Sequence, residues 1–145
     1  MAEAGAIEIP QATLDMISVR ATDQYNEWKT TATEEQKASG LAMLNRYKTD
    51  EAFRTEHTNR MTQTWNDADA DGDGRLNLAE YRVFDAAMRK FKVDAGEWHE
   101  SDHAEENWNI GNSLSEADGC TWAELRAVMK PWMVKFEELK AADGL

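Results

Sequence analysis

The segment DADGDGRLNLAE, from Asp69 to Glu80, decides how the rest of this 145-residue chain is interpreted. Carboxylates alternate at Asp69, Asp71 and Asp73, Gly74 follows them, and Glu80 ends the segment. Alternating carboxylates can all turn toward one point if the backbone winds around it, and a glycine permits the sharp turn that this winding needs. The segment therefore predicts a loop whose oxygen atoms surround a hard cation.

Each specified position agrees with the loop pattern of calcium-binding proteins, D-x-[DN]-x-[DN]-G-x5-E. Calcium takes about six to eight oxygen ligands. The predicted ligands are Asp69, Asp71, Asp73, the backbone carbonyl of Arg75, Asn77 through a water molecule, and both carboxylate oxygens of Glu80. Since Arg75 contributes its carbonyl, its side chain is expected to point outward. The alternative is a solvated Asp/Gly turn, in which four crowded carboxylates without a cation would repel one another strongly.

Helical patterns flank this loop on both sides. Apolar and aromatic residues at helical spacing precede it at Phe53, His57, Met61, Trp65 and Ala68, and follow it at Leu78, Tyr81, Phe84, Met88 and Phe91. Thr49 is expected to cap the first of these helices. Asn77 and Glu80 form a capping-box pair that starts the second. The loop is thus predicted to join two amphipathic helices.

On these residues the chain resembles the EF-hand calcium-binding proteins, closely over residues 53–91 and more weakly over residues 101–133. The resemblance implies an all-α fold with two hands in residues 49–145, one intact and one degenerate. EF-hands usually occur in pairs, joined by a short backbone bridge between their eighth loop positions. The six tryptophans, which favour a rigid core, add a weaker resemblance to the sarcoplasmic calcium-binding proteins.

The partner loop is expected in SEADGCTWAEL, residues 115–125. Aligning Asp118-Gly119 with Asp73-Gly74 leaves no residue at the seventh position and places Cys120 opposite Leu76. We interpret this segment as a pseudo-hand that supports the intact loop through a Leu76–Cys120 bridge. The alternative is an irregular loop that still binds weakly through its remaining oxygen donors, Glu116, Asp118 and Glu124.

The other predicted helices complete an all-α fold. Residues 1–48 are expected to form an N-terminal helical hairpin, a vestigial hand without a calcium loop, whose second helix starts at a Thr33/Gln36 capping box. A helix is predicted to start near Ser101 and reach Asn112. Another capping box, Thr121 with Glu124, predicts the last helix. Pro131 is expected to kink that helix or to begin a new one.

Composition narrows the possible partners and location. The net charge of −12 disfavours nucleic acid, because both molecules are anionic. No apolar run approaches the roughly 18 residues needed for membrane insertion. The first residues, MAEAGAIEIP, do not resemble a signal peptide, and a single cysteine, Cys120, fits a reducing compartment. A cytoplasmic protein is expected.

No catalytic constellation is evident, and the chain is not expected to be an enzyme. His99 and His103 would share a helical face, a spacing seen in zinc sites, but no third ligand is evident and their neighbours are charged. Cys120 is expected to be a small buried contact, because no base stands ready to activate it. A zinc-dependent enzyme is therefore the weaker alternative.

The leading prediction is reversible binding of one Ca²⁺ ion, with Mg²⁺ as the expected competitor, in a calcium buffer or small signalling module. The alternative is a calcium sensor or adaptor, in which binding exposes Trp65, Phe84 and Met88 to a partner helix of a protein target. Flexible Met-rich grooves are typical of sensors, whereas this chain combines scattered methionines with rigid aromatic residues. The buffer is therefore favoured.

Overall fold

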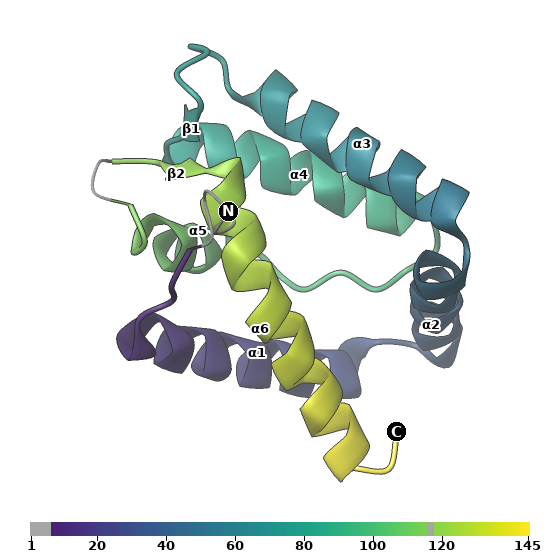
Figure 1. Ribbon diagram of the computed structural model, residues 1–145. Helices are drawn as coiled ribbons and strands as arrows, with labels where there is room; N and C mark the ends of the chain where they lie inside the picture. Colours follow the sequence, from purple (N-terminus) through teal and green to yellow (C-terminus); the bar gives the residue numbers. More distant parts are fainter. Residues whose placement is uncertain (1–6, 116–117) are drawn as a thin grey trace.

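The computed structural model describes residues 7–115 and 118–145, and these form six helices and one two-stranded sheet (Figure 1). The elements in chain order are α1 (Gln11–Thr31), α2 (Glu34–Thr49), α3 (Glu51–Ala68), β1 (Arg75–Leu76), α4 (Leu78–Asp94), α5 (Ala104–Asn112), β2 (Cys120–Thr121) and α6 (Trp122–Ala142). The predicted all-α fold class is confirmed. Among the described residues, no helix combines the length and the apolar character needed to cross a membrane.

Capping side chains start four of the six described helices, α2, α3, α4 and α6. All three predicted capping boxes are present, at Thr33/Gln36, Asn77/Glu80 and Thr121/Glu124. The prediction that Thr49 caps α3 is wrong. Thr49 is the last residue of α2, and Asp50 caps α3 by accepting a 3.0 Å hydrogen bond from the Phe53 amide. A carboxylate is the better cap, because its charge also complements the positive end of the helix.

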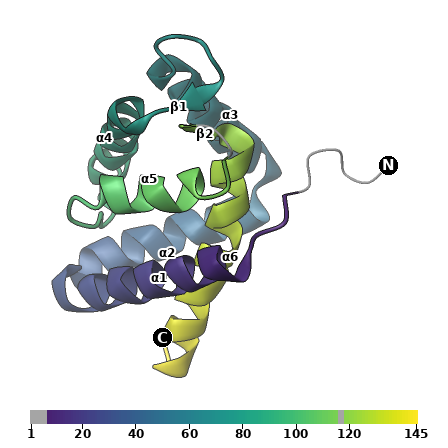
Figure 2. The ribbon, with the colours of Figure 1, turned by 90° about the vertical axis from the view of Figure 1, so that its left-hand side faces the viewer.

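The helices pack as two crossing pairs with α2 and α5 beside them (Figures 1 and 2). α3 lies against α4, and α1 lies across α6. The two N-terminal helices are joined by Ala32 and Thr33, but each finds its main partner elsewhere, α1 on α6 and α2 on α3. In Figure 1 the short sheet lies beside the left end of α4, and α5 lies below the sheet, toward α1.

The core gathers buried side chains from α1, α3, α4, α5, α6 and both strands. Its members are Ile17, Trp65, Ala68, Leu76, Tyr81, Phe84, Ala104, Trp108, Ile110, Cys120, Leu125 and Val128. Burial of this apolar surface is the main force that brings together the loop between α3 and α4 and the loop between α5 and α6. Leu76 and Cys120 are the strand residues of this core, and both are fully buried.

Two C-terminal helices differ in part from the sequence prediction. α5 reaches Asn112 as predicted, but it begins at Ala104, and Asp102 accepts a hydrogen bond from the Ala104 amide. α6 continues as one helix through Pro131, so the proline starts no new helix. A proline removes a single backbone donor, and packing of α6 along α1 outweighs that loss.

Candidate metal centre

The acidic loop, residues 69–80, joins α3 to α4 and brings four carboxylates together. Oxygen atoms of Asp69, Asp71, Asp73 and Glu80 all lie within 4.8 Å of one another. Asp71 and Asp73 are exposed, Asp69 is half-buried, and Glu80 is buried. Of the described residues, these are the one group of three or more acidic, histidine or cysteine side chains that converges in this way.

Hydrogen bonds to the backbone wind the loop. Asp71 and Asp73 each accept a bond from the amide two residues ahead, at 3.2 and 2.9 Å, and Asp69 Oδ2 accepts a 2.9 Å bond from the Gly74 amide. Gly74 has a φ of 81°, a left-handed conformation that residues with a Cβ atom rarely adopt. The residue types of the sequence pattern are therefore those that this local backbone requires.

Glu80 links the end of the loop to its start. Its Oε1 accepts a 3.1 Å bond from the Asn77 amide within the capping box, and its Oε2 accepts a 2.9 Å bond from the Ala70 amide. Each carboxylate oxygen has two lone pairs, so both oxygens retain acceptor capacity. Two roles meet in this residue, since it starts α4 and also carries a charge into the cluster.

One oxygen of the cluster has no hydrogen-bond partner. Oδ1 of Asp69 is buried, and it is the one such unpartnered side-chain atom among the described residues. A buried anionic oxygen without a donor is costly, and a cation would remove that cost. The residues fit a hard cation such as calcium, because carboxylate oxygens are its preferred ligands.

The carboxylates perturb one another. The Arg75 amide stabilises the ionised form of Asp73 and is the main cause that lowers the pKa of its carboxyl group. The Asp73 amide acts in the same direction on Asp71, but desolvation together with the neighbouring Asp73 and Asp69 carboxylates outweighs it and raises the pKa of Asp71. Such opposite pKa shifts are typical of crowded carboxylates, because ionisation of one carboxylate disfavours ionisation of its neighbour.

The middle of the loop is held by the rest of the fold. Leu76 pairs with Cys120 in the antiparallel β1–β2 register, which confirms the predicted pairing of these two residues. The indole N–H of Trp108 on α5 also donates a 2.9 Å hydrogen bond to the Leu76 carbonyl. No local pattern in the sequence marks this role of Trp108, because its partner is 32 residues away.

The side chain of Arg75 points away from the acidic loop, as expected, but it meets a neighbouring part of the fold there. Its Nη1 donates hydrogen bonds to Ser115 Oγ and to the Gly119 carbonyl, the latter at 3.2 Å, and it lies 3.7 Å from Glu124 Oε1. Ser115 and Gly119 lie in the segment between α5 and α6, and Glu124 lies in the first turn of α6. The pairing of β1 with β2 brings Arg75 opposite Thr121, within reach of those acceptors.

The sequence predicts a possible weak second site at Glu116, Asp118 and Glu124. Glu116 lies outside the described residues, and Asp118 is exposed. Glu124 is buried, and its Oε1 accepts hydrogen bonds from the Thr121 amide at 2.8 Å and from Ser115 Oγ at 3.0 Å. Glu124 Oε1 therefore already has donors and a neighbouring cation, in contrast to Asp69 Oδ1, which has neither.

His99 and His103 do not share a helical face. Both precede α5, in a segment that the buried Arg20–Glu100 ion pair fastens to α1 at 2.7 Å. His103 contacts Glu106 and Glu27, at 3.0 and 3.7 Å. Tertiary contacts rather than helix formation thus determine where these two imidazoles lie.

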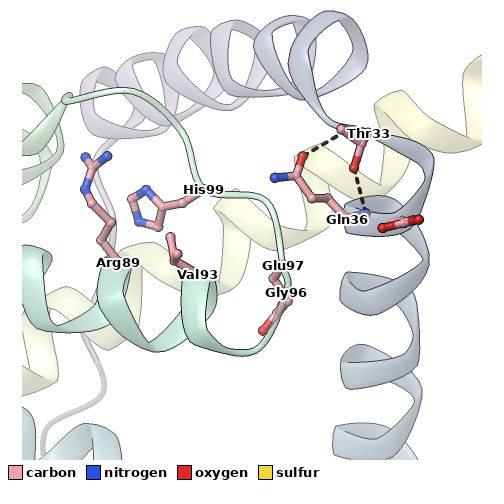
Figure 3. A pocket seen from close by; sticks show the side chains of 8 residues that line it. Thr33, Gln36, Arg89, Val93, Gly96, Glu97 and His99 are labelled. Atoms are coloured by element: carbon pink, nitrogen blue, oxygen red, sulfur yellow. Dashed lines mark hydrogen bonds between the residues drawn. The ribbon is translucent and has the colours of Figure 1, made fainter.

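A polar pocket of about 430 Å³ lies beside His99 (Figure 3). Its lining residues are Thr33, Glu35, Gln36, Arg89, Val93, Gly96, Glu97 and His99. Burial lowers the pKa of His99 and raises that of Glu97, so both groups shift toward their neutral forms. Figure 3 shows the Arg89 guanidinium beside the imidazole, where its positive charge opposes a zinc ion.

Comparison of the chain with protein-family models, with curated proteins and with solved structures finds no match. Functional assignment therefore rests on the acidic loop, with its four converging carboxylates, and on the loop that pairs with it.

Proposed function

We propose that this protein binds one calcium ion reversibly through an EF-hand loop and acts as a calcium buffer or small signalling module. The ligands are Asp69, Asp71, Asp73, the backbone carbonyl of Arg75, Asn77 through water, and Glu80. The loop is the intact member of an EF-hand pair, and the segment between α5 and α6 is its degenerate partner.

The observation that carries this proposal is the state of the four carboxylates. Their oxygens approach within 4.8 Å, and one of them, Oδ1 of Asp69, is buried without a donor. Among the ion pairs of the described residues, none reaches these four acids. A divalent cation supplies the missing positive charge.

Backbone amides prepare the loop for an ion. The amides of Gly74 and Ala70 hold Asp69 and Glu80, and other loop amides hold Asp71 and Asp73. A carboxylate held in this way loses little freedom on binding, so more of the electrostatic attraction contributes to affinity. The ion, when bound, neutralises the mutual repulsion of the acids.

Aromatic packing favours a buffer over a sensor. Trp122 of α6 covers the groove between α3 and α4, with its ring centroid 5.3 Å from that of Trp65 and 6.0 Å from that of Phe84. Trp65 and Phe84 are buried, so a sensor mechanism would have to separate Trp122 from both. Binding of an apolar dye with and without calcium tests this point: an unchanged signal supports the buffer, and a large calcium-dependent gain supports the sensor.

Calorimetric titration with calcium, in a background of millimolar magnesium, tests the proposal. We expect one site per chain, and we expect Glu80→Gln to weaken it by at least about tenfold, because a charged ligand becomes neutral. Asp67→Asn is the matched control, since Asp67 is an exposed acid of α3 outside the ligand set. The wild-type chain failing to bind calcium, or both variants losing equal affinity, would disprove the assignment.

A further inference from the structure

The Arg75 side chain leaves its own loop and enters the segment between α5 and α6, which we term the second loop (described residues 113–115 and 118–121). Its Nη1 contacts the hydroxyl of Ser115 and the backbone carbonyl of Gly119 there, and it lies 3.7 Å from the carboxylate of Glu124 in the first turn of α6. These are three kinds of oxygen that bind a hard cation in proteins. A guanidinium group therefore lies among ligands suited to a metal ion.

The acceptors are organised around this charge. Ser115 Oγ lies 2.7 Å from the Gly119 carbonyl oxygen and 3.0 Å from Glu124 Oε1, so the three acceptors form one connected group. Asn112 Oδ1 accepts a 2.9 Å bond from the Gly119 amide and holds the loop from α5. Glu124 is buried and would be costly as an isolated anion.

The two loops differ in how their anionic oxygens are balanced. Glu80 and Glu124 occupy the same place in their capping boxes, three residues after the capping side chain. Glu124 has the guanidinium beside it at 3.7 Å, whereas no ion pair among the described residues reaches Glu80 or the three aspartates near it. Among the described residues, the one ion pair at these two loops is therefore that of Arg75 with Glu124.

We infer that the Arg75 guanidinium takes the place of a metal ion in the second loop, where it keeps that loop folded and closed to divalent cations. Arg75 is therefore a specificity-determining residue that limits the protein to one ion. The count of one ion rests on the proposed calcium site in the acidic loop, whereas the role in folding the second loop does not.

Close packing fixes the base of this side chain. Gly119 has a φ of 102°, and a Cβ atom built on it would lie 3.1 Å from Arg75 Cβ and 3.2 Å from the Leu76 carbonyl oxygen. The backbone of the second loop thus touches β1 directly at the base of the Arg75 side chain. A free ion in the same group of oxygens would compete with the guanidinium for space and would be repelled by its charge.

Hydrogen exchange of the Cys120 and Thr121 amides, measured in chelator, tests the folding role without any metal. In Arg75→Gln we expect these amides to exchange about tenfold faster, because a charge-assisted hydrogen-bond group is lost. Arg75→Lys should retain most of the protection, since it keeps a cation. Arg82→Gln is the matched control, an exposed arginine of α4 that also pairs with two acids, Asp102 and Glu105.

Calorimetric titration of the same variants with calcium tests the exclusion of metal. Arg75→Gln should take up a second, weaker ion, because the substitution keeps the backbone carbonyl of residue 75 in the acidic loop and removes only the guanidinium. Wild type and Arg82→Gln should take up one ion. Unchanged amide exchange in Arg75→Gln, or equal acceleration in Arg82→Gln, overturns the folding role, and a stoichiometry that stays at one in Arg75→Gln overturns the exclusion. Wild type that binds no calcium disproves the proposed function, yet it leaves the exchange result in chelator intact.

Discussion

The indole N–H of Trp108 donates a 2.9 Å hydrogen bond to the backbone carbonyl of Leu76 inside the core. Leu76 is fully buried and also pairs with Cys120, so the acidic loop is held at its midpoint by both α5 and β2. The carboxylates of that loop repel one another, and the fold has to supply the energy that keeps them close. This anchoring is one source of that energy.

Replacement of Trp108 with phenylalanine should therefore destabilise the metal-free protein. Phenylalanine keeps one six-membered aromatic ring, but the buried Leu76 carbonyl loses a donor, which costs about 1–3 kcal/mol, and the missing part of the indole leaves a small cavity that adds to this loss. Urea unfolding in chelator measures the change. The matched control is Trp98→Phe, because the Trp98 indole donates a 2.9 Å bond to Thr31 Oγ1 at a solvent-accessible position where water can replace it. If both variants lost the same free energy of unfolding, the hydrogen bond from Trp108 to the Leu76 carbonyl would make no special contribution to stability.

Asp69→Asn should change the metal-free and calcium-bound forms in opposite directions. Asparagine can keep the acceptor that the Gly74 amide uses, and it removes one of four crowded charges, so the metal-free protein should unfold at a higher temperature. Calcium affinity should fall by at least about tenfold, since a charged ligand is lost. Thermal unfolding in chelator and in millimolar calcium measures both effects. A variant that is destabilised without metal would show that the carboxylates do not repel one another appreciably.

The buried ion pair between Arg20 and Glu100 should be essential to stability. Both side chains are almost fully buried and lie 2.7 Å apart, and Glu100 also accepts a 2.8 Å bond from Asn107. Glu100→Gln leaves the buried Arg20 charge with only the exposed Asp23, 4.0 Å away, as an acidic partner, and we expect this to cost about 3 kcal/mol or more. Denaturant unfolding provides the measurement.

The surface pair formed by Glu56 and Arg60, 3.5 Å apart one turn along α3, provides the control for that experiment. Glu56→Gln should cost less than about 1 kcal/mol, because solvent screens an exposed pair. If Glu100→Gln were equally mild, the segment before α5 would not depend on the ion pair that fastens it to α1.

Alanine at Gly119 should destabilise the protein more than alanine at Gly74. Both glycines have positive φ values, for which a residue with a Cβ atom pays about 1–2 kcal/mol. At Gly119 the new atom would also lie 3.1 Å from Arg75 Cβ and 3.2 Å from the Leu76 carbonyl oxygen, whereas nothing lies within 4 Å at Gly74. Unfolding in chelator compares them, and a Gly74→Ala loss as large as that of Gly119→Ala would contradict the close contact between the loops.

The Cys120 thiol should resist modification while the protein is folded. Burial raises its pKa to about 12, so at pH 8 the reactive thiolate is scarce and reagents cannot reach it. Labelling with a thiol reagent at pH 8 should be at least about a hundredfold slower in native protein than in urea-unfolded protein, where the pKa is ordinary. Comparable rates in the two states would mean that β2 opens freely, and this would remove the basis for the β1–β2 bridge.

Local chemistry explains how much of this protein was predictable. The turns of the acidic loop, the three capping boxes and the amphipathic helices each depend on residues only a few positions apart, so the pattern in the chain contains them. The Leu76–Cys120 pairing was also accessible, because two similar loop segments could be aligned with each other. Calcium binding itself remains a proposal built on these features.

Tertiary structure decided what depends on elements that meet across the chain. The course of the Arg75 side chain, the hydrogen bond from Trp108 and the Arg20–Glu100 ion pair join positions separated by 32 to 80 residues. Asp50 caps α3 in place of the predicted Thr49 for a local reason, because a carboxylate is a better acceptor at a helix N-terminus than a hydroxyl. Sequence alone therefore determined the acidic loop and the helices beside it, because their bonds are local. Only the packed fold, driven by burial of the shared core, determined which charges each loop would meet.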